Sequence, residues 1–262
     1  MREAMRRAAA LGRAVLDHAL DPAARGHLHD GARAASLGLA GIPSAAEARV
    51  VERDIRLAAE TGCALHVQHV SARESTTLIR AARAAGLRVT GEATPHHLVF
   101  ADADIPGPDT RFKMSPPLRA PADREALRDA VCDGTLGILA TDHAPHPAAA
   151  KARPFDQAPN GVIGLETALA ATAGLLVGER GMAPLDWVRR WTVGPASVLG
   201  VTPPALRPGA PADLVVFDPA ARWTVAASAF RSRSRNTPFD GRVLAGRVRA
   251  TFCRGCLLFQ AD

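Results

Sequence analysis

The sequence predicts an α/β fold: the second half of a (β/α)8 TIM-type barrel, followed by a small β-sandwich portion. Up to about residue 200, short apolar runs alternate with helical stretches rich in alanine and arginine, which is the pattern of strand–helix units on a parallel sheet. The strand–helix units make up only about half of the eight that close a barrel. After Pro203-Pro204, short β-type segments separated by proline and glycine replace the helices. We therefore expect a partial barrel over residues 1–202 and part of a β-sandwich module over residues 203–262.

Each expected element has a local signal. Arginine and alanine alternate at helical spacing from Met1 to Arg13, which indicates an amphipathic helix. Apolar runs are expected to form the parallel strands at Ala14–His18, Ala64–Val70, Arg88–Ala93 and Leu136–Thr141. Helices are expected at 44–61, 73–85, 121–132, 163–178 and 185–193, with Gly62 and Gly86 ending the first two. The strands of the second module are expected at Ala212–Phe217, Arg222–Val225, Arg242–Leu244 and Arg247–Phe252.

The composition is that of a globular protein without a nucleic-acid-binding face. Of the 262 residues, 47% are hydrophobic, which is enough for a large core. The formal charge of +6 comes almost wholly from arginines spread beside acidic residues, which indicates a solvated surface. The run Arg231, Arg233 and Arg235 lacks interleaved aromatic side chains for base stacking, so we expect no nucleic-acid partner. The chain shows neither a membrane span nor a signal peptide, and we expect a cytoplasmic protein.

Polar side chains stand where three of the expected strands end. Asp17-His18 closes the first strand, His66 and His69 lie in the second, and Asp142 follows the fourth. In a parallel barrel the carboxyl ends of the strands carry the catalytic groups, because packed side chains fill the interior below them. Strand alternation sends residues 66 and 69 to opposite faces, so at most one of them faces the mouth. We expect His69 to do so, because it lies nearer the end.

Two imidazoles and a carboxylate at these strand ends form a ligand set that zinc prefers. Asp142 can bind a metal through one oxygen and accept a proton through the other. Each residue also has a plainer interpretation. A lone histidine is more often a core or loop residue than a ligand, and Asp142 in Thr-Asp-His-Ala-Pro-His can simply form an Asx turn.

Longer motifs follow one another along nearly the whole chain, at residues 37–43, 66–71, 92–98, 113–119, 140–146, 154–168, 211–218 and 235–241. In sequence and in order they resemble the carboxy-terminal two-thirds of dihydroorotases of the long bacterial type, which belong to the amidohydrolase superfamily. Glu-x-Thr-Pro-His-His-Leu at 92–98 and Asn-Thr-Pro-Phe at 236–239 favour dihydroorotase. The tail motif at 211–218 is shared with allantoinases and hydantoinases.

This resemblance implies a binuclear zinc centre and a bridging hydroxide that opens a cyclic amide. Dihydroorotate and N-carbamoyl-L-aspartate would be interconverted in this way during pyrimidine biosynthesis. The resemblance assigns His18 and His69 to the second zinc, and assigns Asp142 both to the first zinc and to proton transfer. It assigns substrate binding to His146 and to the Asn160-Gly161 pair, the latter largely through the backbone.

The chain departs from the family pattern in two ways. The His-x-His strand and the bridging carboxylate or lysine of the family have no counterpart before His18. We therefore expect that the chain lacks the amino-terminal part of such an enzyme, and with it most of the zinc ligands. Ser115, in the substrate-contacting Ser-Pro-Pro-Leu-Arg segment, replaces the usual asparagine, and Asn160 stands where an aromatic residue is common.

Two alternatives remain beside a dihydroorotase acting on its small-molecule substrate. The chain could be another cyclic amide hydrolase, an allantoinase or a hydantoinase. It could instead be a non-catalytic, dihydroorotase-like subunit that supports an aspartate transcarbamoylase, which the missing ligands favour. The open edge of a half-barrel also predicts poor solubility or a homodimer, because residues from Ala14 onward would leave backbone groups unpaired.

Overall fold

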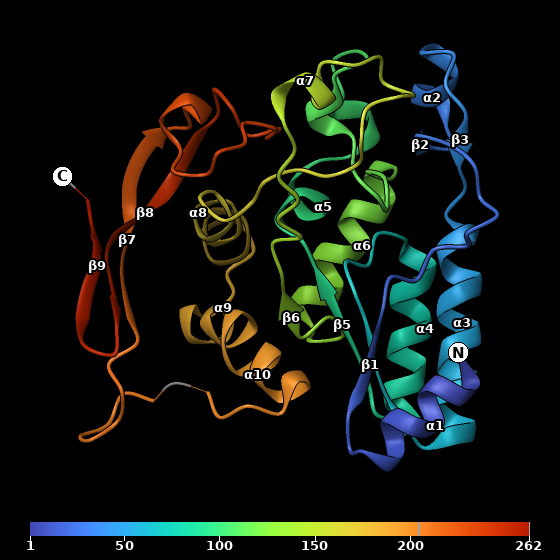
Figure 1. Ribbon diagram of the computed structural model, residues 1–262, viewed down its shortest axis with the longest axis horizontal. Coiled ribbons are helices and arrows are strands. Elements are labelled where there is room, and N and C mark those ends of the chain that lie inside the picture. Colours follow the sequence, from blue (N-terminus) through green and yellow to red (C-terminus); the bar gives the residue numbers. More distant parts are fainter. Residues whose placement is uncertain (204, 262) are drawn as a thin grey trace.

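The computed structural model describes residues 1–203 and 205–261, and an open parallel sheet lies at its centre (Figure 1). The strands of this sheet lie in the order β1 (Ala14–Asp17), β4 (Ala64–Val67), β5 (Val89–Ala93) and β6 (Ile138–Leu139). One face of the sheet is covered by α3 (Ala45–Thr61), α4 (Arg73–Ala84) and α6 (Pro121–Cys132). Helix α1 (Arg2–Ala10) packs against α3 through the fully buried Met5. The arrangement confirms the predicted partial barrel.

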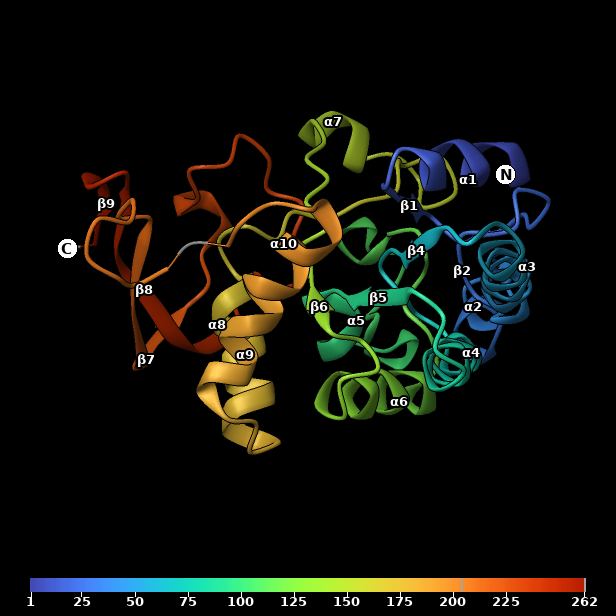
Figure 2. The ribbon, with the colours of Figure 1, turned by 90° about the horizontal axis from the view of Figure 1, so that it is seen from below.

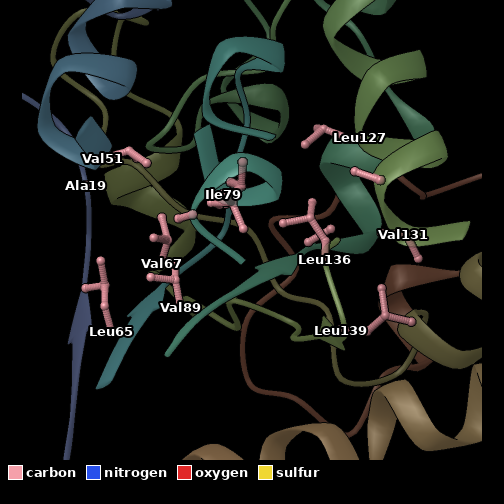
Figure 3. Close-up of a cluster of buried hydrophobic side chains, with 14 of the residues drawn as sticks. Ala19, Val51, Leu65, Val67, Ile79, Val89, Leu127, Val131, Leu136 and Leu139 are labelled. Atoms are coloured by element: carbon pink, nitrogen blue, oxygen red, sulfur yellow. The ribbon is translucent and has the colours of Figure 1, made fainter. Parts of the chain in front are cut away.

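The first core lies between the sheet and these helices (Figure 3). Leu65, Val67 and Val89 extend from the strands into the same cluster as Ile79 of α4. Gly91 is required for this packing, because a Cβ there would lie 2.8 Å from Cδ2 of Leu136 and 3.1 Å from Cδ1 of Ile79. The residues that alternate with these along each strand therefore point to the opposite, inner face of the sheet.

A second core is built from loops and short elements that follow the strands. It joins Phe100 and Phe112 to Phe230 and Phe239 from near the end of the chain. The ring centroids of Phe100 and Phe239 lie 4.9 Å apart, so the late segment packs directly on the barrel portion. The short elements that surround this core are β2 (Leu28–His29), α2 (Ala32–Ser36), β3 (Gly41–Ile42), α5 (Pro95–Val99) and α7 (Ala148–Lys151).

Helices and an antiparallel sheet complete the chain: α8 (Ala168–Thr172), a π-helical segment (Ala173–Glu179), α9 (Pro184–Trp191), α10 (Val193–Leu199), β7 (Leu214–Thr224), β8 (Val243–Cys253) and β9 (Cys256–Gln260). Strand β8 pairs with both neighbours and packs on α8. In both views this sheet stands at the opposite end of the molecule from α3 (Figures 1 and 2). The separate sheet confirms the predicted β portion, while the boundary after residue 202 stays a prediction. Pro204, at that boundary, and Asp262 lie outside the described residues.

Several elements differ from expectation. Strand β4 ends at Val67 and not at Val70, because the backbone of His69 has a φ of 31° and leaves the extended conformation. The strand alternation expected to place His66 and His69 on opposite faces therefore ends before residue 69. The helix expected at 163–178 begins only at Ala168 and continues as a π-helix, and β9 has no counterpart among the expected strands. Within residues 1–203 and 205–261, every helix is too short or too polar to traverse a lipid bilayer.

Candidate metal and substrate site

Two histidines meet beyond the carboxyl ends of β1 and β4. His18 directly follows β1, and His69 comes two residues after β4. Because these strands are parallel neighbours, the residues that follow them emerge at the same edge of the sheet. Nδ1 of His18 and Nε2 of His69 lie 2.9 Å apart, with the rings edge to face and their centroids 4.5 Å apart. The two imidazoles thus direct one nitrogen each at a common point.

The backbone is strained at two of the three expected metal ligands. Among the described non-glycine residues, positive φ occurs at His69 (31°), at Asp142 (46°) and at Arg254 in the β8–β9 turn. Such conformations cost roughly 1–3 kcal/mol each and are typical of functional sites, where the surrounding structure enforces them. Glu92 contributes to this at His69, whose backbone N–H donates to Oε1 of Glu92 over 3.2 Å.

Electrostatics favour a neutral imidazole at His18. The pKa of His18 is lowered from its ordinary value, first by desolvation of the ring and then by the neighbouring His69. The Asp142 carboxylate acts in the opposite direction on the same ring, so its charge is felt there. Nδ1 of His69 is buried and has no hydrogen-bond partner in the described part of the chain. A neutral imidazole is the form in which histidine binds metals.

The geometry of the histidine pair fits one zinc ion in part. Two imidazole nitrogens on a tetrahedral zinc, at ~2.0–2.1 Å each, would stand about 3.3 Å apart, so the pair needs only a small outward movement. Within residues 1–203 and 205–261, however, no three side chains of His, Cys, Asp or Glu come together closely enough to hold a metal. The structure thus brings His18 and His69 together but does not bring Asp142 into a ligand group with them. Three protein ligands are the minimum for a catalytic zinc.

A second group of expected residues comes together after β6. Nε2 of His146 lies 2.7 Å from the carbonyl oxygen of Asn160. Gly161 has a φ of 127°, and a Cβ there would lie 2.5 Å from Cβ of Ala144 and 3.1 Å from Nε2 of His146. Both backbone groups of Gly161 are already used: its N–H donates to Lys113, and its carbonyl accepts from Asn236 and Lys151. The exposed Asn160 is thus the member of the pair with groups left for a ligand.

Ser115 is not part of this group. It is half-buried beside Pro116, and its hydroxyl makes no hydrogen bond to the residues that the structure describes. A cavity of about 750 Å³ lies elsewhere as well, between α8 and the β7–β9 sheet, where Leu169, Phe217 and Trp223 line it. The candidate site therefore consists of the histidine pair and the His146–Asn160 contact, and the part of Asp142 in it stays a prediction.

Some supporting residues have no role in the sequence-based interpretation. Glu92 accepts from His69 through Oε1, and its Oε2 lies 3.0 Å from Nε2 of His66. Asn236 donates from Nδ2 to the carbonyls of Ala144 and Gly161, at 3.0 Å each. A carboxylate inside an otherwise apolar strand was the available signal for Glu92. Asn236 had no such signal apart from the motif that contains it, because its partners lie more than seventy residues away in the sequence.

The chain is similar to known proteins over nearly its whole length. A sequence profile of the amidohydrolase family matches residues 1–258. Among curated relatives, the dihydroorotase of Anaeromyxobacter dehalogenans is 47% identical over the whole chain, and that of Pelotomaculum thermopropionicum is 44% identical over 99% of it. The chain spans 61% of the length of each of these relatives.

Solved structures with the same fold include a dihydropyrimidinase from Brevibacillus agri, with a TM-score of 0.88 and 25% identity. An L-hydantoinase (dihydropyrimidinase) from Arthrobacter aurescens gives a TM-score of 0.86 and 29% identity. Each comparison covers 99% of this chain and about three-fifths of the other, 59% and 60% respectively. The match of the family profile to almost every residue identifies the chain as a member of the amidohydrolase family.

Proposed function

We propose that the chain carries part of the active site of a cytoplasmic, zinc-dependent dihydroorotase, which interconverts dihydroorotate and N-carbamoyl-L-aspartate in pyrimidine biosynthesis. The observation that carries the proposal is the 2.9 Å approach of His18 and His69 at neighbouring strand ends, in a chain 47% identical to a dihydroorotase over its full length. Because the chain spans 61% of that relative, the remaining ligands would come from the part that the match does not cover.

The residues have separate tasks in this proposal. His18 and His69 would hold one zinc ion through Nδ1 and Nε2. Bound zinc would supply a hydroxide nucleophile and polarise the ring carbonyl. Asp142 is half-buried, and its carboxylate makes no hydrogen bond to the described residues, so it is free to accept a proton and return it to the leaving nitrogen. His146 and Asn160 would border the substrate, and Gly161 would let the loop pass close to Ala144 and His146 because it has no side chain. Ser115 lies outside this contact, and its assignment to the substrate rests on the family resemblance alone.

The test is reconstitution in two parts. The chain is mixed with a polypeptide that covers the unmatched part of the Anaeromyxobacter dehalogenans relative, and ring opening of dihydroorotate and zinc content are measured. We expect activity and one of the two zinc ions to be lost in His18→Ala and His69→Ala. In Asp142→Asn, activity should fall by at least 100-fold while the zinc at the histidine pair is retained. His27→Ala, on the loop before β2, is the control. A zinc content equal to that of the unsubstituted complex in both histidine variants would refute the ligand assignment.

Two other functions are supported by particular observations. The likeness to a dihydropyrimidinase and a hydantoinase in structure favours a related cyclic amide hydrolase, an allantoinase or hydantoinase. Hydrolysis of hydantoin, dihydrouracil or allantoin without action on dihydroorotate would select it. The absence of a three-ligand group among the described residues favours a scaffold subunit. Stable co-purification with aspartate transcarbamoylase, without zinc and without rescue by the unmatched part, would select that role.

A further inference from the structure

We propose that Lys113 and Lys151 are positioning residues that hold the loop of residues 155–161 against His146. The proposal rests on the proposed function only in assigning this loop to the substrate. Both side chains are buried, with 3% and 7% of their surface exposed. They are also the only lysines in a chain that has 32 basic residues, so the other 30 are arginines.

Six ammonium N–H groups meet six backbone carbonyls here. Nζ of Lys113 lies 2.5 Å from the carbonyl oxygen of Phe155, 3.3 Å from that of Asp156 and 2.6 Å from that of Ala158. Nζ of Lys151 lies 3.3 Å from the carbonyl oxygen of Lys113, and 3.0 Å from those of Pro159 and Gly161. Because an ammonium has three donors and no acceptor, both groups are satisfied in full.

Among the residues that the structure describes, neither ammonium group has a carboxylate partner within hydrogen-bonding distance. Burial lowers the pKa of both lysines, that of Lys151 to about 8, with the neighbouring Lys113 charge contributing. Asp156 on one side and Asp109 on the other oppose this shift only weakly. Burying ammonium groups against carbonyl dipoles alone costs stability, so the pair is poorly explained as a device for folding.

Arginine could not take the place of either lysine. Guanidinium donors lie in one plane, whereas the carbonyls around each Nζ converge on a single atom from three directions. In a sequence that uses arginine for every other basic residue, lysine stands at the two positions where a compact three-donor cation is required. The choice of residue therefore follows the geometry of the loop.

The pair is coupled to the site through Gly161. Its carbonyl accepts from Lys151, while its N–H donates over 2.9 Å to the carbonyl of Lys113, the same oxygen that Lys151 contacts. The preceding carbonyl, of Asn160, accepts from Nε2 of His146. A carbonyl can only accept, so this contact requires the proton on Nε2 and leaves Nδ1 as an acceptor. The lysines thus determine where Asn160 stands and which tautomer His146 adopts.

The test compares Lys151→Met and Lys151→Arg with Arg153→Met, an exposed control two residues away. In both Lys151 variants, hydrogen exchange of the Gly161 amide should accelerate at least tenfold while exchange of the Leu65 amide is unchanged. The imidazole ¹⁵N signals of His146 should lose the pattern of an Nε2–H tautomer. In the reconstituted enzyme, KM for dihydroorotate should rise at least tenfold with kcat changed less than threefold.

The hydrogen-exchange and ¹⁵N measurements do not require an active enzyme. They therefore test the positioning role of the two lysines even if the chain acts on no cyclic amide. The proposal is overturned if Lys151→Arg behaves as wild type, if hydrogen exchange of the Gly161 amide is unaffected, or if exchange accelerates equally throughout the core. If Lys151→Met does not fold, the rate at which the lysine side chains of the wild-type protein are acetylated tests the proposal instead. Both lysines should be protected at least 100-fold relative to the unfolded chain, and rapid acetylation of the native protein would overturn the proposal.

Discussion

Replacement of Glu47 by glutamine tests the buried ion pair that Glu47 forms with Arg119. Glu47 is 1% exposed, and its carboxylate accepts from the backbone N–H groups of Ser71, at 3.1 Å, and Ala72, at 3.0 Å. It also accepts from the Ser71 hydroxyl and faces NH2 of Arg119 at 3.8 Å. Ala72 is the N-cap residue of α4 and has no capping side chain of its own. The carboxylate of Glu47 therefore caps that helix from outside.

The expected loss can be worked out from these contacts. Glutamine preserves the shape but removes the counter-ion of Arg119, which is 2% exposed, and breaking a buried pair costs about 3–5 kcal/mol. Hydrogen bonds to a charged acceptor are also worth ~1 kcal/mol more than those to a neutral one. Because the amide still caps α4 in part, we expect the free energy of unfolding to fall by about 3–4 kcal/mol. That is a large share of the ~5–15 kcal/mol typical of a domain.

The assay is urea unfolding followed by circular dichroism. Glu52→Gln is the matched control, because Glu52 is exposed on the same helix, and it should change the unfolding free energy by less than ~0.5 kcal/mol. The double variant Glu47→Gln/Arg119→Met should recover at least half of the loss, since it removes both charges. If Glu47→Gln is as stable as Glu52→Gln, or if the double variant loses the sum of both single losses, the carboxylate is not balancing a buried cation.

Other predictions address the loop, acid stability and association. Gly161→Ala should cost about 2–4 kcal/mol and abolish the His146–Asn160 contact, because its Cβ would overlap Ala144; unchanged stability and an unchanged His146 spectrum would contradict this. Burial lowers the pKa of His97 to about 3. The unfolded chain binds this proton below pH 6.5 and the folded chain does not, so stability present above pH 6.5 should decline by about 4–5 kcal/mol towards pH 3. His97→Gln should flatten that slope in unfolding measurements at stepped pH. The chain should sediment as a dimer or larger species, since Leu16 on edge strand β1 is 43% exposed and Val215 on β7 is 54% exposed; a monodisperse monomer at 50 μM would refute that expectation.

The elements with strong local signals are those that the sequence predicts well. Helix α6 has the expected bounds, because Pro121 suits a first helical turn, and α3 ends before Gly62, whose φ of 65° suits glycine. Strand β4 is shorter than expected because no sequence pattern reveals the left-handed backbone of His69. Elements of two to five residues, such as β2, are too short for periodicity to mark them.

In the site, too, the sequence predicts what regular structure determines and misses what irregular backbone determines. The meeting of His18 and His69 follows from the order of parallel strands, since residues after neighbouring strands emerge side by side. The contacts of Lys113 and Lys151 with the 155–161 loop depend on how that loop closes, and no spacing rule describes this. Sequence reasoning thus identifies groups that regular structure brings together, and it misses the irregular backbone that fixes their orientation.

The amide of Asn236 bridges Ala144 and Gly161 from a stretch near the end of the chain. During synthesis, this stretch leaves the ribosome long after both of its partners. A nascent polypeptide that stops short of it can already possess the parallel sheet, yet the backbone on either side of His146 lacks the bridge that Asn236 supplies. Competence to bind a ligand there should therefore arise only once Asn236 has been synthesised, and a premature stop codon before residue 236 should abolish it even where the barrel strands survive.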